Sequence, residues 1–187
     1  MDKAVFTNFP IIHTERLTLR ALTNSDIYDF YRILSSETAM RYYGIMPVES
    51  REIASWFIDQ YRSGFLNETL IRWAITFKES GDFIGSCGFQ GLNENASRAE
   101  IGYELHPNYW GYGYMKEALS AIIAWGFDIF ELNRIEALIY PENIPSEKTI
   151  LSLGFTLEGC LKEYAFFRNQ YTDLNLFRLL KREYTLL

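Results

Sequence analysis

Cysteine and histidine are scarce in this sequence, which holds two of each among 187 residues. Cys87 and Cys160 do not form a Cys-x-x-Cys spacing, so the sequence predicts neither a zinc site nor a disulfide framework. We expect no metal site, and we expect both cysteines to be buried thiols on strands.

Long apolar runs and flexible linkers are also missing. No run reaches the roughly 18 apolar residues of a membrane span, and residues 1–10 lack the apolar centre of a signal peptide. No Pro/Gly/Ser-rich linker, repeat or low-complexity block divides the chain, and 48% of its residues are hydrophobic. We therefore expect one domain over residues 1–187, located in the cytoplasm, with no membrane partner.

Positive charge is in deficit. The chain has 24 acidic and 18 basic residues, for a net charge of −6. This balance disfavours a nucleic-acid partner and mildly favours a cationic substrate.

The most informative motif in the sequence is a glycine-rich turn. Gly111 and Gly113 are separated by one residue, and downstream of them apolar residues recur at steps of three and four. The spacing predicts a helix with one buried face that continues to about Phe130. Its apolar positions are Met115, Ala118, Leu119, Ile122, Trp125, Gly126 and Ile129.

The two glycines predict an anion-binding turn. Glycine adopts backbone angles that other residues avoid, so several N–H groups can converge on a phosphate in front of the positive end of a helix dipole. The spacing differs from the P-loop and from Gly-x-Gly-x-x-Gly, in which Lys116 would have to be glycine, and this argues against ATP and NAD. A Gly-x-Gly pair alone is more often a purely structural turn, so the choice between a structural turn and an anion site depends on the flanking sequence.

A strand is predicted on each side of this helix. Residues 98–105 alternate an apolar face with a face that carries Glu100 and Glu104. Residues 134–140 predict a further strand, followed by a short helix that ends near Leu153. Strand, glycine turn, helix and strand together form a βαβ unit.

The rest of the chain supplies more strands and two more helices. Thr23 and Asp26 have the spacing of a capping box before a helix, and a second helix follows Ser50. The sequence therefore predicts an α/β (α+β) fold with a mixed sheet. Further strands are expected over residues 17–21, 71–77, 83–89, 155–167 and 171–180.

Four motifs in order carry a family resemblance. They are residues 99–105, the loop 110–114 around the glycines, Asn143 with Ser146, and residues 153–155. Together they resemble the GCN5-related N-acetyltransferases (GNAT), and the likeness covers nearly the whole chain. It implies the acyl-CoA N-acyltransferase fold, whose central sheet is mixed, mostly antiparallel and flanked by helices. Within the family the closest likeness is to the Rim type, which acetylates the N-termini of ribosomal proteins.

The resemblance implies acetyl-CoA as the donor. The backbone of Leu105 and His106 is expected to pair with the pantetheine arm like an added strand, with an N–H near the oxyanion. Asn108 and Tyr112 replace a Gln or Arg and a Lys of the family motif, so the pyrophosphate is expected to depend on backbone N–H groups and on Lys116. The expected cofactor-binding residues are Leu105, His106, Trp110, Gly111, Tyr112, Gly113, Tyr114, Met115, Lys116, Asn143 and Ser146, of which Trp110 and Tyr114 are also candidates for simple packing.

Acetyl transfer to an amine requires a base, an oxyanion donor and an acid. Glu100 is the first candidate base, because an acidic residue at this place can act through water in the resembling family. Rim-type enzymes carry a glutamate where this chain has Ala165, and Glu163, expected on the same strand face, is the fallback.

The acid is the second catalytic question. The tyrosine that many family members carry seven residues after Asn143 is Ile150 here. Ser146, which resembles a Rim-type serine near the thioester sulfur, is the candidate for protonating or hydrogen-bonding the thiolate. Its structural alternative is the N-cap of the helix that follows.

The acceptor is less well defined by the sequence. Several aromatic residues on the predicted strands could line an acceptor groove covered by the loop over residues 40–50, or they could be buried in the core. We expect an acetyl-CoA-dependent N-acetyltransferase that acts on a protein N-terminal α-amine, with a ribosomal-protein N-terminus as partner. The alternatives are an acetyltransferase of a small amine (polyamine, amino acid or antibiotic) and a non-catalytic CoA-binding module; family likeness is compatible with a homodimer. The aromatic residues in question are Trp73, Phe89, Tyr103, Tyr164, Phe166 and Phe167.

Overall fold

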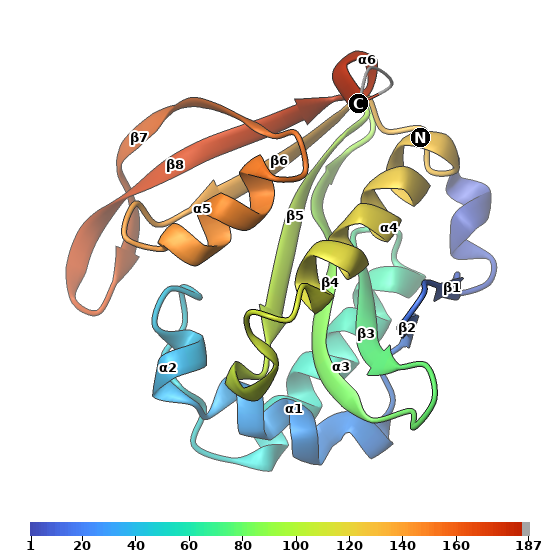
Figure 1. The fold of residues 1–187 in the computed structure, drawn as a ribbon, viewed down its shortest axis with the longest axis vertical. Helices are drawn as coiled ribbons and strands as arrows, with labels where there is room; N and C mark the ends of the chain where they lie inside the picture. The colour runs from blue at the N-terminus through green and yellow to red at the C-terminus, as the bar shows by residue number, and fades with distance from the viewer. Residues whose placement is uncertain (185–187) are drawn as a thin grey trace.

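In the computed structural model, which describes residues 1–184, eight strands form one mixed sheet with helices on both faces (Figure 1). The strand order is β1-β2-β3-β4-β5-β6-β8-β7, and every neighbouring pair is antiparallel except β5 and β6. The predicted mixed, mostly antiparallel sheet is thus confirmed. The strands are β1 (Ile12–His13), β2 (Leu17–Ala21), β3 (Ile71–Phe77), β4 (Phe83–Asn93), β5 (Arg98–Leu105), β6 (Arg134–Ile139), β7 (Thr156–Phe167) and β8 (Gln170–Leu180).

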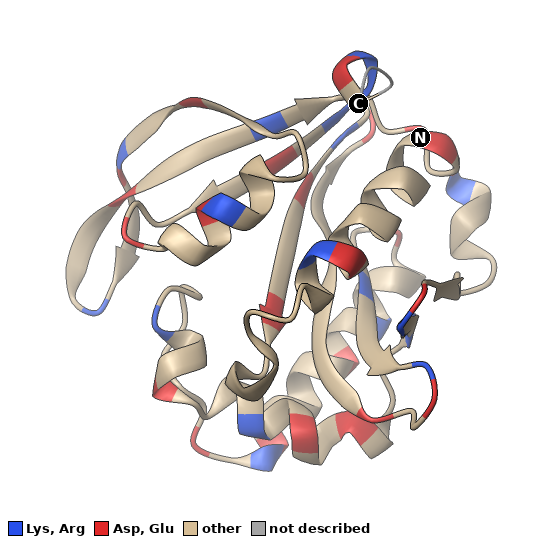
Figure 2. Cartoon of the chain, in the orientation of Figure 1, with Lys and Arg blue, Asp and Glu red and all other residues tan. Residues whose placement is uncertain are grey.

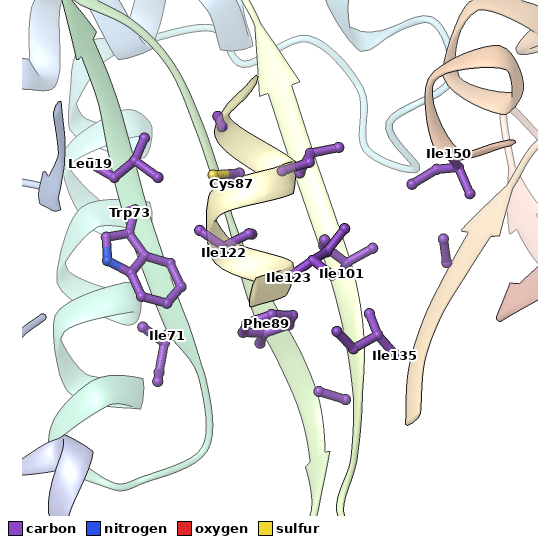
Figure 3. Packing of buried hydrophobic residues seen from close by; sticks show 14 of the residues in the cluster. Leu19, Ile71, Trp73, Cys87, Phe89, Ile101, Ile122, Ile123, Ile135 and Ile150 are labelled. Atoms are coloured by element: carbon purple, nitrogen blue, oxygen red, sulfur yellow. The ribbon is translucent and has the colours of Figure 1, made fainter. Parts of the chain in front are cut away.

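The helices divide between the two faces of the sheet because alternate strand residues point to opposite sides. On β3, Trp73 packs in a core with residues of α4, whereas Ala74 packs in a second core with α1 and α3. Figure 3 shows Trp73 and Phe89 beside Ile122 of α4. The helices are α1 (Ile27–Leu34), α2 (Glu37–Met40), α3 (Arg51–Leu66), α4 (Tyr114–Asp128), α5 (Ile144–Leu151) and α6 (Lys181–Tyr184), with short 3-10 turns at Lys3–Phe6, Asn24–Asp26 and Pro107–Tyr109.

Most predicted boundaries lie within a few residues of the observed ones, and the capping box of Thr23 and Asp26 is present. Two expected burials are wrong. Ile129 is 53% exposed because α4 ends one residue before it. Cys160 is exposed because β7 is an edge strand that pairs only with β8, whereas Cys87 lies on central β4 and is fully buried.

No helix within residues 1–184 is both long and apolar enough to cross a membrane. Figure 2 shows Lys and Arg interspersed with Asp and Glu in this view, without a basic stripe of the kind that follows a nucleic-acid backbone.

The position of the site follows from the parallel pair. β5 and β6 are in register over three residue pairs, from Arg98 with Arg134 to Glu100 with Glu136. Beyond Glu100 the two strands diverge, so the second half of β5 has backbone groups on one side without a β6 partner. Figure 1 shows α4 beginning and α5 lying beside this split.

Candidate active site

A cavity of about 700 Å³ occupies the split between β5 and β6. Both faces of the second half of β5 contribute to it, with Ile101, Tyr103 and Leu105 from one face and Gly102 and Glu104 from the other. The cavity joins the glycine loop (residues 110–114) to the expected base. Of the predicted site residues, Glu100, Leu105, Trp110, Gly111, Gly113, Tyr114, Met115, Lys116, Asn143 and Ser146 line it, and His106, Tyr112 and Glu163 do not.

The glycine loop has the conformation that the sequence predicts. Gly111 and Gly113 have φ values of +83° and +80°, and Gly113 is the N-cap of α4. No side chain within residues 1–184 caps this helix end. The first backbone N–H groups of α4 therefore lie at the cavity with the positive end of the helix dipole.

The end of β5 is fixed from two sides. The N–H of His106 donates to the carbonyl oxygen of Ile84 at 2.9 Å, and the indole Nε1–H of Trp110 donates to the carbonyl oxygen of Leu105 at 2.8 Å. Because successive residues of an antiparallel strand direct their N–H groups to opposite sides, the Leu105 N–H points into the split. Of the two backbone positions expected beside the pantetheine arm, only Leu105 therefore has its N–H on the cavity side.

The N-cap of α5 is a different residue from Ser146, the residue considered for that role. Asn143 is the N-cap, and its Oδ1 accepts from the Ser146 N–H at 3.3 Å. The interpretation of Ser146 as the cap is wrong, because the helix begins at Ile144, one residue before Pro145. The Ser146 hydroxyl instead lies 2.6 Å from the Tyr103 hydroxyl.

The Tyr103–Ser146 contact crosses the split and joins β5 to α5. Burial raises the pKa of Tyr103 to about 12, so its hydroxyl stays protonated at neutral pH. The pair is a hydrogen-bonded hydroxyl chain on the cavity wall, and a protonated phenol can donate to Ser146 while the serine proton points elsewhere.

Glu100 lies half-buried where β5 and β6 begin to diverge. Its Oε1 accepts a hydrogen bond from Gln90 Nε2 at 2.9 Å. Burial raises the pKa of Glu100, and the nearby carboxylate of Glu136 raises it further against the lowering effect of Gln90. A carboxylate whose pKa is raised toward neutral pH is a stronger base than an exposed one.

Glu104 is in a different state, although it shares a strand face with Glu100. It is buried in an ion pair with Arg72, and Tyr43 donates to its Oε2 at 2.7 Å. Ser86 donates to its Oε1 and accepts from Arg72 Nε at 2.7 Å. The charge of the Glu104 carboxylate is thus compensated by Arg72, and both of its oxygens accept hydrogen bonds.

Sequence reasoning did not identify the partners of Glu104. Arg72 and Ser86 are polar residues inside otherwise apolar strands, which is the one signal that the sequence offers for a buried polar cluster. Nothing local in the sequence pairs them with Tyr43, which comes from the loop over residues 41–50.

Glu163 lies outside the cavity. The register of β7 with β8 shifts between Leu161 and Ala165, and Glu163 has a positive φ of +50° and an exposed side chain. The irregularity breaks the two-residue alternation, so spacing from Ala165 does not place Glu163 on the expected face.

The six aromatic residues considered for an acceptor groove do not form one. Trp73 and Phe89 are buried in the α4-side core, Phe167 is buried, and Tyr164 and Phe166 are exposed. Tyr103 is the one aromatic of that set among the cavity-lining residues, and the loop over residues 41–50 adds Tyr42 and Tyr43.

The split sheet, the glycine loop and the carboxylate lie around one cavity, and comparison with known proteins identifies the class of enzyme. Residues 16–156 match the acetyltransferase (GNAT) domain model. The chain is 39% identical over 173 residues to the uncharacterised N-acetyltransferase p20 of Bacillus licheniformis, covering 92% of this chain and 97% of that one. It is 37% identical over 101 residues to the ribosomal-protein-serine acetyltransferase of Escherichia coli, covering 54% and 56%.

The fold is also shared with the crystal structure of spermidine N-acetyltransferase from Vibrio cholerae in complex with CoA and spermine. The TM-score is 0.81 at 23% identity, over 92% of this chain and 98% of that one. The protein belongs to the GNAT family and is an N-acetyltransferase.

Proposed function

We propose that this N-acetyltransferase takes the acetyl group of acetyl-CoA and transfers it to the α-amine at the N-terminus of a protein, with a ribosomal protein as the expected acceptor. The observation that carries the proposal is that the glycine loop and Glu100 line the same cavity. The name of the Escherichia coli relative supports the acceptor class.

The donor is assigned to the α4 side of the split. Glycine-loop and α4 N–H groups would bind the pyrophosphate, with Lys116 as a nearby positive charge. The Leu105 N–H and Asn143 flank the path of the pantetheine arm along β5. The Leu105 N–H is also the group available to hydrogen-bond the thioester oxygen as it becomes an oxyanion.

The acceptor is assigned to the α3 side of the split. The charges there favour an acceptor with one amino group over a polyamine. Two carboxylates line the cavity, and Arg72 neutralises one of them, Glu104. Glu100 remains as the carboxylate without a cationic partner among the contacts described. A monocationic amine complements one carboxylate, whereas the second charge of a polyamine would find no further unpaired carboxylate among the cavity-lining residues.

The chemistry also favours an α-amine. At pH 7, deprotonation costs about 1.4 kcal/mol for an α-amine and about 4.6 kcal/mol for a lysine. Glu100 would take the proton as the nitrogen attacks the thioester carbon. The tetrahedral intermediate then expels the CoA thiolate, to which the Ser146 hydroxyl would donate a hydrogen bond.

Replacing Glu100 with Gln should lower kcat/KM about 10-fold or more, because the amide cannot accept the proton. Glu100 must be deprotonated to act, and its pKa is raised, so wild-type activity should fall as pH drops through that raised value. At acidic pH the wild-type plot of log kcat/KM should have a slope of about two, from the amine and from Glu100. The variant should keep a slope of about one. Equal slopes for the two proteins would remove Glu100 from the mechanism.

Replacing Ser146 with Ala should lower kcat with little change in the Kd for CoA, because the serine hydroxyl acts on the departing thiolate. Tyr103→Phe should lower kcat by a smaller factor, since it removes only the hydroxyl that orients Ser146. Stopped-flow thiol release and titration with CoA measure the two effects. An unchanged kcat for Ser146→Ala would show that the serine is not the acid.

The acceptor assignment is tested by a panel of amines at equal concentration. Peptides with a free N-terminal Ser or Ala, the same peptides with a blocked N-terminus, spermidine and free amino acids are compared by CoA thiol release. The proposal expects the free N-terminal peptides to have the highest kcat/KM. A higher value for spermidine would move the acceptor to the small-amine class, and micromolar CoA binding with no turnover on any amine would indicate a binding module.

A further inference from the structure

An arginine far away in the sequence lies against the glycine loop. Arg16, just before β2, donates from Nη1 to the carbonyl oxygen of Tyr112 at 3.0 Å. Its guanidinium carbon is 4.4 Å from the centre of the Tyr114 ring. A Cβ added at Gly113 would lie 3.5 Å from Arg16 Nη2. One side chain therefore contacts Tyr112 and Tyr114 and lies near Gly113 between them.

The same arginine is held by a carboxylate in the first turn of α4. Arg16 Nε donates to Glu117 Oε2 at 2.6 Å, and the Arg16 backbone N–H donates to Oε1 at 2.8 Å. Thr14 adds a hydrogen bond from its hydroxyl to Oε1 at 2.5 Å. Segment 14–16 is thus bound to α4 through a single carboxylate that accepts three hydrogen bonds.

The charge state of this carboxylate matters for the helix end. Burial raises the pKa of Glu117, but the hydrogen bonds from Thr14 and Arg16 outweigh it, and the pKa lies below its ordinary value. Glu117 is therefore ionised at neutral pH. An ionised carboxylate in the first turn would repel a phosphate bound at the same helix end unless a cation compensated it.

We propose that Arg16, paired with Glu117, is a positioning residue for the pyrophosphate of CoA. It fixes the Tyr112 carbonyl on the side of the loop away from the phosphate, so that the loop N–H groups face the cavity, and it cancels the Glu117 charge. This inference rests on the proposed function, because it takes the glycine loop as the pyrophosphate site.

The test compares two donors that differ in the pyrophosphate. Acetyl-CoA has it, and acetyl-pantetheine keeps the thioester and arm without it. Arg16→Ala should raise the KM for acetyl-CoA by about 10-fold to 100-fold, the range for losing hydrogen bonds to a charged group. The KM for acetyl-pantetheine should change less than twofold. Arg62→Ala is the matched control, because Arg62 also pairs with one carboxylate at 3.0 Å but on the exposed face of α3.

A second variant separates the two effects of Arg16, which are compensation of the Glu117 charge and positioning of the glycine loop. In Arg16→Ala/Glu117→Gln the uncompensated carboxylate is gone, so the KM for acetyl-CoA should recover part of the way toward wild type. An Arg16→Ala defect that is equal for the two donors, or a KM for acetyl-CoA that stays at the wild-type value, would overturn the inference. Wild-type turnover with both donors is measured first, since its absence would count against the proposed function and not against the role of Arg16.

Discussion

Replacement of Gly111 by valine is expected to abolish CoA binding while the protein remains folded. Gly111 has a φ of +83°, and no heavy atom lies within 4 Å of a Cβ built there, so a Cβ meets no clash. Valine avoids this backbone region at a cost of about 1–3 kcal/mol. The loop would relax to a negative φ, and the N–H groups that converge on the pyrophosphate would turn away from it.

Gly81→Val is the matched control for this prediction. Gly81 has a φ of +77° and equally open surroundings, but it lies in the turn between β3 and β4 and does not line the cavity. Both variants should lose similar thermal stability, and only Gly111→Val should lose heat of CoA binding in calorimetry. If Gly111→Val binds CoA with wild-type affinity, the glycine loop is not the pyrophosphate site.

Replacement of Arg72 by methionine is expected to lower the free energy of unfolding by about 3–5 kcal/mol, the range for removing one partner of a buried ion pair. Methionine fills the space of the side-chain stem, but Glu104 is left buried without its cation. The loop over residues 41–50 should also loosen, because Arg72 Nη2 donates to the Tyr43 hydroxyl at 3.3 Å and this bond is lost. Urea unfolding measures the loss.

Two further variants check the origin of this loss. Arg72→Met/Glu104→Leu should be more stable than Arg72→Met alone, because it also removes the unpaired charge. Arg32→Met removes an exposed ion pair with Asp29 and should change stability little. An Arg72→Met loss no larger than that of Arg32→Met would contradict the view that the cluster around Glu104 organises the acceptor side.

Local patterns predicted what depends on neighbours along the chain. The alternation over residues 98–105 gave β5 its observed bounds, and the Gly-x-Gly spacing placed the positive-φ turn and the start of α4. These features are set by steric limits on single residues and by the two- and 3.6-residue periods of strands and helices. They place the donor end of the site.

Contacts between distant residues could not be predicted in this way. Arg16 meets Glu117 across 101 positions, and Tyr43 meets Glu104 across 61. Such pairs depend on how the sheet and helices pack, and hydrophobic periodicity does not encode them. The irregular register near Glu163 is also a tertiary feature, because the alternation used to place that residue assumes a regular strand.

The candidate site likewise has a part that could be predicted from local sequence and a part that depends on tertiary contacts. The glycine loop is local and was predicted, whereas the environment that distinguishes the two carboxylates of β5 is tertiary. The Glu100 carboxylate accepts a hydrogen bond from the amide of Gln90, and the Glu104 carboxylate meets a guanidinium and two hydroxyls. The strand pattern alone makes the two residues equivalent, and the packing of β3, β4 and the loop over residues 41–50 separates them.

The most direct test of the central claim is to find where the acetyl group goes. A peptide with a free N-terminal serine and one internal lysine is incubated with the protein and acetyl-CoA at neutral pH, and tandem mass spectrometry locates the label. We expect acetylation of the α-nitrogen, matched by release of one CoA thiol per product and lost with Gly111→Val. Label on the lysine alone, or bound CoA without any acetylated peptide, would contradict it.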